Sequence, residues 1–186
     1  RDGSPDAEAI DDASAYATAY AYATGIEQES GGDSATMTLT NHGDVSATAT
    51  ANAVAATRAC AWASATGVYQ EADGDGNNVA DTYNDGSITA SAVAGATGTK
   101  AYAGASATGV DQYGYGGVAQ LTITNHGEIA ANATSTAYGT ELKATGYAEA
   151  SGAYQYASAD NSTIDLVNSS TISAIANINA YGQTSA

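Results

Sequence analysis

A short acidic segment, residues 73–78 (DGDGNN), has residue types and a spacing that suit calcium binding. Alternate oxygen-bearing side chains, here Asp73, Asp75 and Asn77, typically open a calcium loop, but Asn84 replaces the bidentate acid expected at the twelfth position. The segment also occurs in one copy only, although the chain is otherwise repetitive. Calcium is therefore kept as a candidate ligand, and no other cofactor is expected.

No set of residues has the pattern of an enzyme active site. Acidic side chains fall mostly in turn-like segments, without a partner that would converge on them. His42 and His126 each stand between an asparagine and a glycine, so we interpret them as solvated turn residues. The lone Cys60 offers neither a disulfide framework nor a metal cluster. We predict that the chain is not an enzyme; a β-helix polysaccharide lyase or hydrolase would need an irregular cleft of acids and bases.

Three basic residues, Arg58, Lys100 and Lys143, recur at one position of a repeated pattern, nine residues before a glycine that is repeated. They are three of the four basic residues in the chain. Stacked like charges repel one another unless acidic groups of a neighbouring subunit or an anionic glycan neutralise them. The alternative is a solvated basic row in an acidic protein.

Three aromatic residues, Tyr20, Trp62 and Tyr147, share a second repeated position, which Gly104 occupies in the third copy. We expect their side chains to point outward from strands, where they could contact partners or sugars. Together with the basic row they are the candidate interface, and a surface polysaccharide is a candidate partner.

The composition limits the other function classes. The formal net charge is −16, from 20 acidic and 4 basic side chains, so we expect no nucleic-acid partner. No apolar run approaches the roughly 18 to 20 residues of a membrane span. With no Phe, one Met and one Trp, the chain lacks the large side chains of an ordinary core, so alanine methyl groups must fill it.

Two markers recur in step along the chain. The first is a glycine directly followed by a hydrophobic-x-Gln pattern, and its glycines are spaced by 42, 42 and 43 residues. The second is an asparagine followed in three copies by x-Gly, with spacings of 43, 41 and 43 residues and an aliphatic residue shortly after it. The repeated amides are Gln28, Gln70, Gln112 and Gln155 in the first marker and Asn41, Asn84, Asn125 and Asn168 in the second. We predict a single domain, 1–186, with units at about 1–42, 43–85, 86–126 and 127–169 and a partial unit at 170–186.

Alanine alternates with polar or aromatic residues inside each unit. Ala59, Ala61, Ala63 and Ala65 precede the second marker glycine, and equivalent alternation precedes the others. Period two with small apolar residues on one side indicates β-strands with one buried face. An alanine-rich helix is the alternative, but helical spacing would scatter these alanines around its whole circumference.

Units with one-faced strands bury those faces by stacking on one another. The sequence therefore predicts an all-β fold, a parallel β-solenoid (β-helix) of four repeats of about 42 residues with a flattened, alanine-rich core. Equivalent asparagines and glutamines would form ladders whose amides bond to one another and to turn backbone. We expect the marker glycines to supply the positive φ that such corners need.

One coil per unit keeps these ladders unbroken, whereas two coils of about 21 residues would break the amide stack. We therefore expect one flattened coil. In it, strands near 35–41 and 44–54 form one layer, a strand near 57–69 forms the other, and residues near 71–79 form the turn. Facing alanines would bring the layers closer than the usual ~10 Å.

Units of the form N-x-G-x-[IV]-x-A-x-A, followed by A-x-A-x-A-x-A-T-G-[IV]-x-Q, resemble the repeats of bacterial secreted β-solenoid proteins of the autotransporter-passenger and adhesin class. The resemblance covers nearly the whole chain and concerns the style of the repeat, not a catalytic motif. It implies export, and hence an extracellular or cell-surface location.

The chain starts and stops at about the same phase of the repeat, with residues 2–9 at the phase of residues 44–51, and neither end carries a polar cap. Another copy could complete such a solenoid head to tail, which gives an open fibre. We therefore predict a structural subunit of an extracellular bacterial filament or surface assembly that self-associates into a homopolymer. The alternatives are a stalk or passenger segment of a surface adhesin or autotransporter, and an excised fragment of a longer array.

Overall fold

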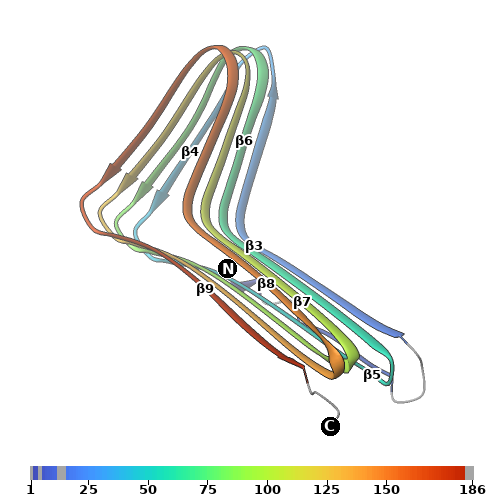
Figure 1. The fold of residues 1–186 in the computed structure, drawn as a ribbon. Coiled ribbons are helices and arrows are strands. Elements are labelled where there is room, and N and C mark those ends of the chain that lie inside the picture. Colours follow the sequence, from blue (N-terminus) through green and yellow to red (C-terminus); the bar gives the residue numbers. More distant parts are fainter. Residues whose placement is uncertain (1, 4–5, 12–15, 183–186) are drawn as a thin grey trace.

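The computed structural model describes residues 2–3, 6–11 and 16–182, and these form strands joined by short bends (Figure 1). The strands are β1 (Asp2–Gly3), β2 (Asp6–Asp11), β3 (Tyr16–Gly32), β4 (Ala35–Asn41), β5 (Asp44–Ala55), β6 (Arg58–Asn84), β7 (Ser87–Asn125), β8 (Glu128–Asn168) and β9 (Thr171–Gly182). Over these ranges there is no helix, and hence none long and apolar enough to cross a membrane. The fold is all-β, so the helical alternative is wrong.

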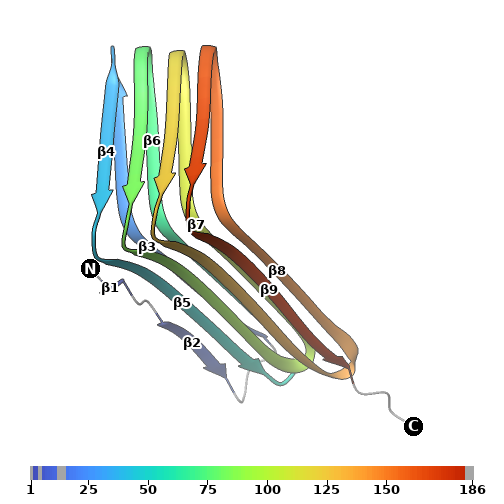
Figure 2. The ribbon, with the colours of Figure 1, turned by 90° about the vertical axis from the view of Figure 1, so that its left-hand side faces the viewer.

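All strands belong to one sheet, and every pairing is parallel. Paired residues lie 41 to 44 positions apart, as in Tyr16 with Arg58 and Asp6 with Thr50. The chain therefore makes one circuit, and not two, for each length of about one repeat unit. Successive circuits lie side by side, perpendicular to the direction of the strands (Figures 1 and 2).

Each circuit is bent in its middle into two legs (Figure 1). In the first leg, residues 44–55 face residues 58–66, and their alanines form one buried cluster. In the second leg, residues 68–74 and 78–84 run up to and back from a far turn. Residues 35–41 and 44–54 form one layer opposite residues 58–74, as expected, but the bend divides this layer between the two legs.

The expected turn at 71–79 is also longer than the observed one. Strand β6 runs through this segment, and its irregularity is confined to the register shift between Gly74 and Asn77. The positive φ angles among the described glycines are at this far turn, 123° at Gly32 and 110° at Gly116.

The glycines of the first marker are required by space, and the expectation that the marker glycines supply positive φ is wrong. A Cβ on Gly67 would lie 2.7 Å from Ile88 Cγ2 and 2.6 Å from the Gly109 carbonyl oxygen. A Cβ on Gly109 would lie 2.5 Å from Ile129 Cγ2. Glycine thus lets the aliphatic residue of the other marker reach the backbone at the bend, where a second buried cluster forms around Ile88 and Ile129.

Candidate functional site: two amide columns and an aromatic groove

The asparagine column (Asn41, Asn84, Asn125, Asn168) lies at the bend, where the second leg passes into the first. Each Nδ2 donates to the Oδ1 of the next asparagine, at 2.7, 2.7 and 2.8 Å along the chain. The same amide groups also donate to backbone oxygens; Asn84 Nδ2, for example, lies 3.1 Å from the Glu128 carbonyl oxygen. Asn84 and Asn125 are fully buried, so these bonds satisfy side chains that water does not reach.

The glutamine column (Gln28, Gln70, Gln112, Gln155) lies in the second leg, and its central members Gln70 and Gln112 are fully buried. Each Nε2 donates to the Oε1 of the preceding glutamine, at 2.7, 2.7 and 2.8 Å. Thr82 Oγ1 donates to Gln70 Oε1 at 2.8 Å, so a buried hydroxyl joins the column. The asparagine column therefore donates toward the C-terminal circuit, and the glutamine column donates toward the N-terminal circuit.

The candidate calcium ligands lie at the far turn of the second leg. The register shift beside Gly74 falls between Asp73 and Asn77, and the Asn77 backbone nitrogen donates to Ser34 Oγ at 3.3 Å. In the part of the chain that the structure describes, no three His, Cys, Asp or Glu side chains are grouped as a metal ion would need. Asp73 instead lines a shallow hollow with Glu29 and Glu71.

His42 and His126 lie on the short bends between the legs, in register with Asp85 and Ser169. His42 Nδ1 is 2.7 Å from Asp85 Oδ1, and His126 Nδ1 contacts Ser169 Oγ. Both rings pack against Tyr83 from neighbouring circuits, with centroid distances of 6.2 and 5.6 Å. These contacts link successive circuits along the axis.

The basic column (Arg58, Lys100, Lys143) is formed as its spacing predicts, by three residues in register on neighbouring strands of the first leg. All three side chains are exposed. The Arg58 guanidinium carbon lies 5.0 Å from the centroid of the Tyr102 ring. The described residues form a single ion pair, His42 with Asp85, so no described carboxylate neutralises this column.

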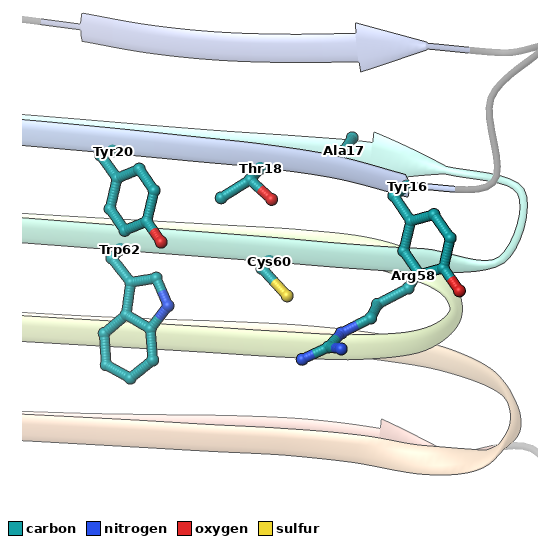
Figure 3. Close-up of a pocket in the computed structure, with 7 residues that line it drawn as sticks. All are labelled: Tyr16, Ala17, Thr18, Tyr20, Arg58, Cys60 and Trp62. Atoms are coloured by element: carbon teal, nitrogen blue, oxygen red, sulfur yellow. The ribbon is translucent and has the colours of Figure 1, made fainter.

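Beside the basic column lies an open groove of about 310 Å³, which we call the Trp62 groove. Figure 3 shows Tyr20 beside Trp62 at one end, Tyr16 beside Arg58 at the other, and Thr18 and Cys60 between them. Its lining residues are Tyr16, Ala17, Thr18, Tyr20, Arg58, Cys60 and Trp62.

Gly104 fixes the position of the Trp62 ring. A Cβ on Gly104 would lie 2.2 Å from Trp62 Cε3 and Cζ3, so the indole lies directly over this glycine. A second, smaller hollow of about 150 Å³ adjoins the ring and extends to Tyr147 on β8. The aromatic residues picked out by the repeat therefore line one continuous stretch of surface.

A tyrosine cluster on the second leg was missed by the sequence reasoning. Tyr113 lies between Tyr69 and Tyr154, at centroid distances of 5.7 and 5.8 Å, and near Tyr115 and Tyr156. Asp111 is held beside this cluster, where Tyr113 Oη donates to its Oδ2 at 3.4 Å while its Oδ1 is buried without a partner. Burial raises the pKa of the Asp111 carboxyl to about 6. The sequence did contain a signal for this cluster, because its tyrosines recur at equivalent positions of the repeat.

Comparison of the chain with protein-family models, with curated proteins and with solved structures finds no match in any of the three.

Proposed function

We propose that the chain is a four-repeat β-solenoid and serves as a structural subunit of an extracellular filament, in which copies pair head to tail through their strand edges. The resemblance of its repeats to those of secreted bacterial solenoids supports the extracellular setting. The role is structural and not catalytic, since the buried polar groups bond to one another along the axis.

The observation that carries this proposal is the exposure of core positions in the last described circuit. Leu121 and Ile123 are fully buried, whereas their paired residues Ile164 and Leu166 are 50% and 46% exposed. Ile164 and Leu166 therefore belong to columns of side chains that point into the core. An edge of this kind, with unpaired backbone groups and apolar side chains, is a template for another strand.

The first circuit offers a matching edge. If the pairing register continued by one circuit, Met37 and Leu39 of the next copy would cover Ile164 and Leu166. Asn168 Nδ2 would donate to Asn41 of that copy, and Gln28 of that copy would donate to Gln155, as their equivalents do inside the chain. Covering the exposed halves of two aliphatic side chains would contribute about 1 kcal/mol each, in addition to the backbone pairing.

The test compares two neighbouring substitutions on this edge, Leu166→Lys and Val167→Lys. Both side chains are 46% exposed, but Leu166 lies in a core-facing column and Val167 in the column of Thr124, which faces outward. Light scattering should show a mass that grows with concentration for the wild type, and electron microscopy should show uniform fibres. Leu166→Lys should raise the concentration needed for assembly at least tenfold, because a charge at the joint costs more than about 1.4 kcal/mol.

Val167→Lys should change that concentration by less than about threefold, since a lysine on the outer face remains solvated. Equal effects of the two substitutions would contradict pairing through the core-facing edge. Rods of fixed length that contain one chain at every concentration would refute polymerisation and favour a stalk segment of a surface adhesin or autotransporter.

The extracellular setting needs its own measurement. An antibody raised against the folded protein should label intact cells of the source organism, or fibres outside them. Labelling that appears only after lysis would contradict the proposed location while leaving the assembly result unaffected.

A further inference from the structure

The Trp62 groove combines exposed aromatic rings at one end with an exposed cation at the other. Tyr20 and Trp62, at one end, are 56% and 43% exposed, which makes flat apolar surface available to a ligand. Arg58, at the other end, is exposed and has no described carboxylate beside it. The hydroxyl groups of Tyr16 and Thr18 lie along the same lining.

We propose that this groove binds an acidic saccharide, a sugar chain that carries carboxylates, with one ring against Trp62 and a carboxylate directed toward Arg58. Sugar rings present C–H faces that pack on exposed aromatic rings, and their hydroxyl groups bond to polar neighbours. This inference is independent of filament formation, because the groove is complete within one chain.

Charge selects the acidic class of saccharide. The chain carries 20 acidic and 4 basic residues, yet three of the four basic residues stand in the one column that borders this groove. Cations stacked at strand spacing, ~4.8 Å apart, repel one another, so a ligand with repeated negative charges relieves that repulsion. A neutral saccharide would leave the column unneutralised.

The arrangement also fits a linear ligand. The basic column continues past Arg58 to Lys100 and Lys143, and the aromatic surface continues past Trp62 to Tyr147. Both columns run perpendicular to the strands, about 13 Å apart, since four residues of a strand separate them. A sugar chain lying along the strands would span the ~13 Å from Trp62 to Arg58, so that one ring packs on the indole and the carboxylate of another ring reaches the guanidinium.

The protein carries two built-in reporters for the test. Trp62 is the only tryptophan and Cys60 the only cysteine of the chain, and both line the groove. An oligogalacturonate should therefore shift the tryptophan fluorescence and slow the reaction of the thiol with a maleimide. The methyl-esterified form of the same oligosaccharide, which keeps the rings and removes the charge, should bind at least tenfold more weakly.

Three substitutions separate the contributions of the groove. Arg58→Gln should weaken oligogalacturonate binding about tenfold at low salt, and about 1 M salt should abolish the difference, because the Debye length is then ~3 Å. Trp62→Ala, read by thiol protection, should weaken binding at least tenfold. Gly104→Ala should weaken binding several-fold without removing any lining group, because the added methyl group displaces the Trp62 ring.

Tyr156→Ala is the matched control, since this side chain is 43% exposed, as Trp62 is, but lies on the second leg. It should leave the affinity unchanged within about twofold. Equal binding of the acid and its methyl ester would overturn the acidic class of ligand. Absence of both a fluorescence shift and thiol protection would overturn the site itself, as would equal losses in Trp62→Ala and Tyr156→Ala.

Discussion

Replacing Asn84 by alanine measures what the asparagine column contributes to stability. The substitution removes the bonds from Asn41 and to Asn125, both at 2.7 Å, and the bond to the Glu128 carbonyl oxygen at 3.1 Å. Asn41 Nδ2 keeps its contacts with two backbone oxygens, but the buried Asn125 Oδ1 loses its donor. A buried acceptor left unpaired costs ~1–3 kcal/mol and each lost bond ~1 kcal/mol, so we expect a loss of about 3 kcal/mol in the free energy of unfolding.

The control is Asn168→Ala, in the same column but exposed. Its partner Asn125 Nδ2 keeps the Gly127 and Thr171 carbonyl oxygens, at 3.0 and 3.2 Å, so the loss should be about 1 kcal/mol. Urea denaturation of dilute, monomeric protein gives both values, provided that the slope of free energy against urea stays constant. Losses that agree within about 0.5 kcal/mol would refute the argument that burial makes the column stabilising.

Two further substitutions test the bend and the tyrosine cluster. Gly67→Ala should lower the melting temperature, because overpacking costs ~1–3 kcal/mol and the stiffer unfolded chain returns at most ~1 kcal/mol. Gly43→Ala is the control, since no atom lies within 4 Å of the added carbon, and it should be neutral or stabilising. Equal shifts in melting temperature for the two variants would contradict the packing argument. Asp111→Asn should stabilise the protein at pH 7 by about 1 kcal/mol, a value reduced for solvent screening because the carboxyl is partly exposed. Since burial raises the folded pKa to about 6 from 3.8, the wild type should gain stability relative to this variant as the pH falls from 7 to 4, and parallel stability curves over this range would contradict the assignment.

The parallel sheet and the columns of like residues could be predicted because they depend on period alone. Alternation in residues 59–65 determines which side chains face inward, and a nearly constant unit length determines which residues pair. The amides of Asn84 and Gln70 follow from the same periodicity, since each recurs at its own phase of the unit.

The bend could not be predicted because it depends on contacts between the two markers. The pattern shows that Gly67 and Ile88 each recur, but it does not show that they touch, and that contact is what requires glycine at this position. The raised pKa of the Asp111 carboxyl could not be predicted from the sequence for a similar reason. Strand alternation places this residue outward, while its desolvation depends on how closely Tyr113 and its neighbours pack around it.

The opposite directions of the two amide columns have an electrical consequence. Each row of aligned amide dipoles would on its own give a long assembly a moment that grows with length, but the asparagine and glutamine rows point in opposite senses and largely cancel. A fibre of any length would therefore carry little net side-chain polarity along its axis. Neighbouring fibres could then bundle in the same or the opposite orientation without an electrostatic preference from these columns.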